Sequence, residues 1–86
     1  MDATAKIVIG NLGLAVREAE VRRSPDEFAP VVHRLKPNQA VALVPTDDPY
    51  WLKVVGKHGD EAFVRSIDVI DLGYPLRRTA PARVII

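Results

Sequence analysis

The chain has 86 residues, of which 48% are hydrophobic and 27% charged, a balance typical of one small globular domain with a thin core. Lys and Arg number 12 against 11 Asp and Glu, and this net charge of +1 argues against non-specific nucleic-acid binding, which needs clustered positive charge. The absence of cysteine excludes disulfides and thiolate metal sites.

The amino-terminal quarter of the chain predicts two strands separated by a glycine turn. Lys6–Ile9 is rich in β-branched residues, and the two glycines of Gly10–Gly13 can take positive φ in a tight turn. Leu14–Arg22 alternates loosely and predicts a strand bent near Glu18. A helix is the competing interpretation, because Ala, Glu and Arg favour helices, but the short length and adjacent turn signals favour a strand.

The middle of the chain reads as a loop, a strand and a tight turn. Two prolines bracket the segment Arg23–Pro30, and each restricts the residue before it to extended backbone, so we expect an irregular loop. Val31–Leu35 predicts a short strand. Lys36–Gln39 predicts a turn with Pro37 at its second position, where the required φ is already set.

The rest of the chain continues with short strands and frequent turns. Further strands are expected at Ala40–Val44, Tyr50–Val55, Glu61–Arg65 and Val69–Leu72, joined by a polar turn at Pro45–Pro49, a hairpin at Gly56–Asp60 and a 3₁₀ turn at Ser66–Asp68. Ala40–Val44 is apolar throughout, which predicts a strand covered on both faces. About six short strands at this spacing predict a small all-β barrel or sandwich.

Several of these segments resemble the bacterial SH3-like domain family. Ala19–Pro25 is similar to the family's opening motif, in which Val-Arg and a proline lead into the long first loop, and Leu35–Gln39 resembles its tight turn. Trp51–Val54 resembles its Trp-aromatic-Lys-Val strand, and Lys57–Val64 its hairpin. The match covers Leu14–Leu72, about two thirds of the chain. It implies an SH3-like barrel of five to six short antiparallel strands within residues 1–72, followed by an extended tail at 73–86.

Tyr50 and Trp51 form the first candidate binding surface. Neighbours on a strand point to opposite faces, so one ring should be buried and the other more exposed. In the simpler interpretation Trp51 packs in the core or at its rim, since aromatic residues dominate small cores. In the functional interpretation one of the two rings anchors a ligand.

The loop Arg23–Pro30 is the second candidate, because in SH3-like barrels this loop borders the ligand groove. Asp26, Glu27 and Phe28 are its expected contact residues, although a loop that simply faces water is the simpler interpretation. Phe28 is the most informative of the three, since an aromatic ring in a loop must pack on something or stay exposed.

The carboxyl-terminal tail is a third candidate for partner contact. Its basic part is extended, and a short charge cluster is usually a solvated linker. The last three residues are apolar, so we expect them either to add a strand to this barrel or to dock on another chain, and a homo-oligomer is one such outcome. The residues expected to contact a partner are Tyr74, Arg77, Arg78, Val84, Ile85 and Ile86.

The sequence shows no catalytic apparatus, and we expect neither a metal nor a cofactor. His33 and His58 are the only histidines, whereas a metal site needs three or four convergent ligands. Ser24 and Ser66 have no patterned base near them. The chain is therefore expected not to be an enzyme.

The amino terminus lacks the basic and apolar segments of a signal peptide, and no stretch approaches the length of a membrane span. We therefore expect a cytoplasmic protein if the chain is full length, an extracytoplasmic one if it is an excised domain, and no membrane contact.

These observations predict a non-catalytic binding module that mediates protein–protein assembly. Its expected mechanism combines backbone pairing at an open barrel edge with anchoring by Tyr50, Trp51 or Phe28. The resemblance also implies a first alternative, a cell-wall targeting domain of a larger protein that binds peptidoglycan peptide or glycan. A small nucleic-acid-binding barrel is the second alternative, which the charge balance disfavours.

Overall fold

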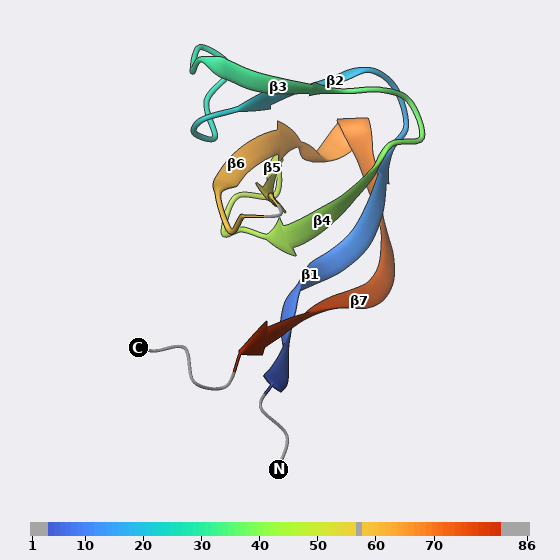
Figure 1. The fold of residues 1–86 in the computed structure, drawn as a ribbon. Helices are drawn as coiled ribbons and strands as arrows, with labels where there is room; N and C mark the ends of the chain where they lie inside the picture. The colour runs from blue at the N-terminus through green and yellow to red at the C-terminus, as the bar shows by residue number, and fades with distance from the viewer. Residues whose placement is uncertain (1–3, 57, 82–86) are drawn as a thin grey trace.

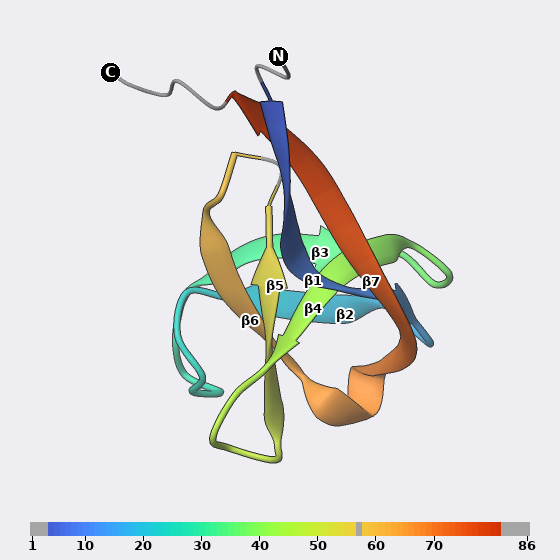
Figure 2. The ribbon, with the colours of Figure 1, turned by 90° about the horizontal axis from the view of Figure 1, so that it is seen from below.

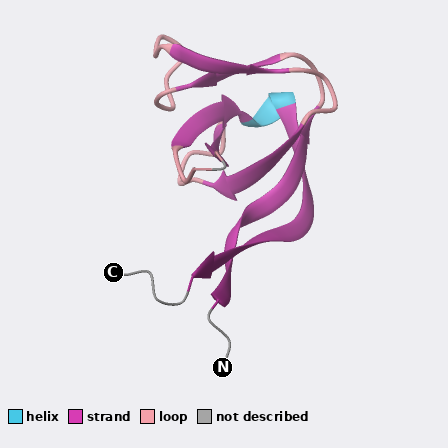
Figure 3. Cartoon of the chain, viewed as in Figure 1, coloured by secondary structure: helices cyan, strands magenta, loops and turns pink. Residues whose placement is uncertain are grey.

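The computed structural model describes residues 4–56 and 58–81, which form one antiparallel sheet of seven strands (Figures 1 and 3). The strands are β1 (Thr4–Ala15), β2 (Ala19–Arg22), β3 (Val31–Leu35), β4 (Ala40–Pro45), β5 (Trp51–Val55), β6 (Glu61–Arg65) and β7 (Val69–Pro81). A 3₁₀ turn at Ser66–Asp68 separates β6 from β7, and the described residues contain no other helical segment. The all-β antiparallel class predicted from the sequence is therefore confirmed.

The sheet does not close into the predicted barrel. Its strand order is β3-β2-β6-β5-β4-β1-β7, so β3 and β7 are its two edges. Both sides of β4 are occupied, by β1 and β5, which leaves no free edge on β4 for β3 to pair with. β7 pairs with β1 along a ribbon that leads away from β3 (Figure 1). The barrel prediction is wrong in this respect, and the sheet is strongly curved but open.

The hydrophobic core lies where the β2–β3 hairpin folds over the rest of the sheet (Figure 1). Leu43 of β4 and Val64 of β6 are completely buried at its centre, and Leu35 of β3 is 1% exposed. The core cluster consists of Ala15, Ala19, Val21, Leu35, Leu43, Val64 and Val69. Ala19 and Val21 alternate with polar neighbours on β2, as a strand with one buried face requires.

The segment Gly10–Gly13 is not a turn, which corrects the sequence-based prediction. β1 continues through this segment without a break, although its pairing with β7 shifts register at Val8/Gly10 and at Leu12/Gly13. Gly10 has φ +146°, and a Cβ there would lie 2.7 Å from the carbonyl oxygen of Leu43. A Cβ on Gly13 would overlap the Leu43 side chain. The lack of a side chain at these glycines therefore allows β1 to lie close to β4; the chain does not reverse direction here.

The last strand is much longer than the predicted Val69–Leu72. β7 continues to Pro81, so the predicted division between barrel and tail at Gly73 falls inside a strand. The tail is extended as predicted, and it pairs with β1 of its own chain, from Leu76 opposite Gly10 to Pro81 opposite Thr4. The predicted contact residues Val84, Ile85 and Ile86 lie outside the described residues.

Most of the predicted turns are confirmed. The Gln39 amide donates to the Lys36 carbonyl at 3.0 Å across the tight turn, and Asn38 there has φ +67°. The Gly56 amide donates to the Asp60 carbonyl at 2.8 Å in the β5–β6 hairpin. Residues 14–22 form strand rather than helix and are broken at 16–18.

The strand expected at Ala40–Val44 is present, and it is covered on both faces only at its centre. The neighbours Ala42 and Leu43, which point to opposite faces, are both buried, whereas Ala40 is exposed.

Candidate binding surface

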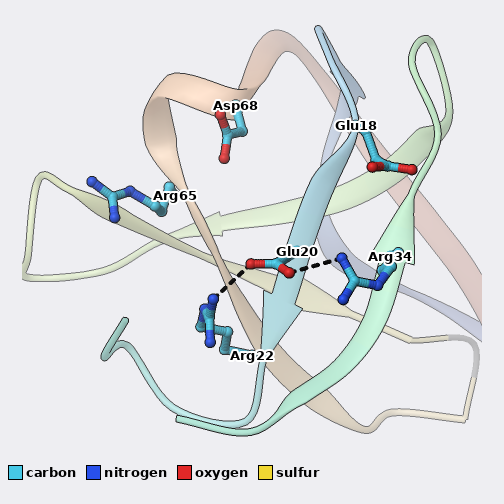
Figure 4. Close-up of a pocket in the computed structure, with 6 residues that line it drawn as sticks. All are labelled: Glu18, Glu20, Arg22, Arg34, Arg65 and Asp68. Carbon is cyan, nitrogen blue, oxygen red and sulfur yellow. Dashed lines mark hydrogen bonds and ion pairs between the residues drawn. The ribbon is translucent and has the colours of Figure 1, made fainter. Parts of the chain in front are cut away.

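A charged cleft of about 300 Å³ lies where β2 and β3 meet the end of β6 and the 3₁₀ turn (Figure 4). Three carboxylates and three guanidinium groups line it: Glu18, Glu20, Asp68, Arg22, Arg34 and Arg65. This set is called the charged cleft below. Opposite charges in equal number give it no overall preference for an anion or a cation.

Glu20 fixes one wall of the charged cleft. Its two carboxylate oxygens accept hydrogen bonds from Arg22 at 2.6 Å and from Arg34 at 2.7 Å (Figure 4). Glu20 and Arg22 are two residues apart on β2 and so share a face, while Arg34 stands opposite Glu20 in the β2–β3 ladder. Arg22 also donates to the Ala29 carbonyl at 2.8 Å, which ties the loop 23–30 to this wall.

On the other wall, Asp68 is hydrogen-bonded, but among the residues that the structure describes Arg65 and Glu18 are not. Arg17, just outside the cleft, donates to Asp68 at 2.8 Å and to the Ile67 carbonyl at 2.6 Å. Arg65 forms an exposed ion pair with Glu27 at 3.6 Å, beyond hydrogen-bonding distance. The side chains of Arg65 and Glu18 make no hydrogen bond within the described residues. These two are therefore the least tightly held charges of the charged cleft.

Of the two neighbouring rings, Trp51 is buried and Tyr50 is exposed, as predicted. Trp51 is only 8% exposed, and the guanidinium carbon of Arg65 lies 5.9 Å from the centre of its ring. Tyr50 is 72% exposed. Trp51 therefore packs in the protein, in agreement with the simpler interpretation, and Tyr50 remains available to a partner.

The three candidate residues of the loop 23–30 have different environments. Asp26 organises the loop itself: its carboxylate accepts from the Phe28 amide at 2.8 Å, and its carbonyl accepts from the Ala29 amide at 3.0 Å. Glu27 faces Arg65. Phe28 is 87% exposed. Of the three, Phe28 is the one apolar side chain, and it is left exposed.

Phe28, Tyr50 and Ile67, here called the apolar rim, are exposed on segments that contact residues of the charged cleft. The loop of Phe28 is bonded to Arg22 through the Ala29 carbonyl, and Ile67 adjoins Asp68 in the 3₁₀ turn. The Ser66 amide, next to Arg65, donates to the Tyr50 carbonyl at 2.9 Å, and the Ile67 carbonyl holds Arg17. In Figure 2 all three segments lie in the half of the molecule away from the termini, with the loop 23–30 at one side and the 3₁₀ turn at the other. Ile67 is 66% exposed.

No protein-family model, characterised protein or solved structure matches the chain. The tail residues predicted to contact a partner do not belong to the rim. Tyr74 is 66% exposed and Arg77 is also exposed, but both lie on β7, in the ribbon with β1. Arg78 lies on the same strand, opposite Ile7 in the ladder.

The histidines considered as metal ligands and the serines considered as nucleophiles do not form one site. His33 lies on β3 and His58 in the β5–β6 hairpin, and the Ser66 hydroxyl donates to the Pro49 carbonyl at 2.9 Å. Within residues 4–56 and 58–81 there is no group of three side chains placed to ligate a metal. The same residues include no helix with the length and apolarity needed to cross a membrane.

Sequence reasoning missed the charged cleft and Ile67. One signal was available, because Glu18, Glu20 and Arg22 alternate along one predicted strand and must share a face. Nothing in the sequence shows that Arg34, Arg65 and Asp68 complete the same cleft. Ile67 had no signal, since a single apolar residue in a 3₁₀ turn is as easily buried as exposed.

Proposed function

We propose that this chain is a non-catalytic binding module that mediates protein–protein interaction, and that its partner docks on the apolar rim and the charged cleft. The observation that carries the proposal is the exposure of Phe28, Tyr50 and Ile67 by 87%, 72% and 66% on segments tied to one cleft. Clustered exposed apolar side chains mark interaction sites, and aromatic anchors supply most of the energy at such sites.

The charges favour a particular kind of partner. Arg65 and Glu18 are the cleft groups without hydrogen-bond partners among the described residues, and they carry opposite charge. An extended peptide segment with an apolar side chain between an acidic and a basic residue would satisfy both groups and the rim. A polyanion is disfavoured, because three carboxylates line the same cleft.

We also propose that the chain is an open relative of the bacterial SH3-like domains. The sequence motifs quoted above support this, as does the arrangement of a long loop at 23–30, a hairpin at 56–60 and a 3₁₀ turn before the last strand. In that family the first loop borders the ligand groove, and in this chain the same loop carries Phe28.

A random peptide library displayed on phage and selected on the full chain tests the proposal. The selected peptides should bind saturably and carry an apolar anchor with both charges nearby. Phe28→Ala and Tyr50→Ala should each weaken binding about tenfold or more, the loss expected for an aromatic anchor. Tyr74→Ala is the matched control, since Tyr74 is 66% exposed on β7, and it should leave binding unchanged.

Three results would overturn the proposal. The first is selected peptides that bind the Phe28→Ala and Tyr50→Ala proteins as well as they bind the original. The second is saturable binding to purified peptidoglycan that Phe28→Ala abolishes, which would establish the cell-wall alternative. The third is submicromolar binding to single-stranded DNA that falls steeply with salt, which would establish the nucleic-acid alternative.

A further inference from the structure

A second surface lies on the inner face of the β2–β3 hairpin, beside the open edge of β3. Two cavities of about 690 and 340 Å³ share His33 and Gln39 and form one groove, called the seam groove below. Val21, Val32 and Ala62 line its larger part, and Leu76 of β7 lines the other end. Val21 alternates with Glu20 on β2, so the seam groove and the charged cleft lie on opposite faces of the hairpin.

The edge strand beside this groove is suited to pair with another strand. β3 is the last strand of the sheet and contains no proline, and its Val31 and Val32 are 37% and 46% exposed. The other edge, β7, contains Pro75 and Pro81, which have no N–H to donate. An unpaired, proline-free edge next to an apolar groove is the arrangement that accepts an added strand.

We propose that the seam groove binds residues 83–86 of a second copy of this chain as a strand added to β3. These residues, Arg-Val-Ile-Ile, lie outside the described part of the structure. Their β-branched apolar side chains suit both strand backbone and the apolar walls of the groove. Asp60 is the one carboxylate among the described residues lining the two cavities, and it offers a partner to Arg83.

Residues 82–86 of the same copy cannot occupy the groove, because of the distance that they would have to cover. Leu76 lines one end of the groove, and β7 continues away from it for five more residues to Pro81 (Figure 1). At ~3.3 Å per residue, that is about 17 Å. Residues 82–86 span about the same length when fully extended. Residues 82–86, doubled back along β7, would reach only to about Leu76, short of Asp60 and Ala62. A second copy has no such restriction, and mutual exchange of tails gives a closed dimer.

Light scattering after gel filtration, over a range of concentrations of the full chain, tests this proposal. The chain should dimerise, and Ile85→Asp should weaken dimerisation roughly tenfold or more, because it places a charge against the apolar wall. Val32→Asp should act similarly. Val16→Asp is the matched control, since Val16 is 49% and Val32 46% exposed and Val16 lies outside the groove, and it should leave the dimer unchanged.

Exchanging the charges of Asp60 and Arg83 tests whether the seam groove is the site that binds residues 83–86. Asp60→Arg and Arg83→Asp should each weaken the dimer about fivefold, and the double variant should restore it. A chain that stays monomeric at all concentrations overturns the proposal, as does a dimer that survives Ile85→Asp. Peptide binding at the apolar rim is measured separately, so loss of the dimer in Ile85→Asp with rim binding retained supports the dimer and leaves the proposed function standing. Loss of rim binding alone refutes only the proposed function.

Discussion

Replacing Gly10 by alanine tests the observed path of β1. Gly10 has φ +146°, a conformation that residues with a side chain adopt at a cost of about 1–3 kcal/mol. The new Cβ would also lie 2.7 Å from the Leu43 carbonyl oxygen, which belongs to the backbone of β4 and cannot move alone. Overpacking of this kind costs about 1–3 kcal/mol. Gly10→Ala should therefore lower the free energy of unfolding by about 2–6 kcal/mol.

Urea unfolding followed by the fluorescence of Trp51, the only tryptophan and 8% exposed, measures this loss. With a urea slope of about 1–3 kcal/mol per molar, a loss of 3 kcal/mol lowers the midpoint by about 1–3 M. Gly59→Ala is the control, because Gly59 has φ +84° but nothing within 4 Å of a new Cβ, so only the backbone cost of about 1–2 kcal/mol applies. Equal losses in the two variants would refute the close approach of β1 to β4.

Three further changes test the core, the ion pairs and a turn, each by the same urea titration. Leu43→Ala should cost about 2–5 kcal/mol, because Leu43 is 0% exposed at the centre of the core; a loss below 1 kcal/mol would contradict that placement. Glu20→Ala should cost about 1–2 kcal/mol, since it removes the shared acceptor of Arg22 and Arg34, and the cost should shrink in high salt. Asn38→Gly should be neutral or stabilising and Asn38→Ala should cost about 1 kcal/mol, because Asn38 has φ +67°; the reverse order would exclude this turn geometry.

The parts of the fold predicted correctly are those that depend on a few neighbouring residues. The turn at Lys36–Gln39 follows from proline at its second position and asparagine at its third, and the hairpin at Gly56–Asp60 follows from its two glycines. Strands β3 and β6 match their predicted bounds because such turn residues mark both ends. Local backbone preferences are sufficient for features of this size.

The error at Gly10–Gly13 shows where local reasoning fails. A glycine pair between apolar runs has the same sequence whether it reverses the chain or allows another strand to approach closely. The deciding partner is Leu43, about thirty residues away, and no local pattern announces that contact. Barrel closure failed for a related reason: whether β3 meets β4 depends on which strands already occupy the edges of β4.

The binding surface was predicted only in part, because some of its features depend on neighbouring residues and others on contacts between distant segments. The expected alternation of neighbouring residues correctly separated a buried Trp51 from an exposed Tyr50, although Tyr50 lies just before β5 rather than on it. The charged cleft combines residues from β2, β3, β6 and the 3₁₀ turn, and only the folded sheet brings them together.

Both proposed surfaces depend on one strand register. On β2, Glu20 points to the charged cleft while Val21 points to the core and the seam groove, and the same alternation places Arg34 opposite Glu20 and His33 opposite Val21. A slip of one residue between β2 and the sheet would bury Glu20 and expose Val21. Burial of Val21, at 2% exposure, opposes such a slip on one face, and the Glu20–Arg34 ion pair opposes it on the other. The contacts that stabilise the hairpin therefore also keep each proposed binding surface on its own face.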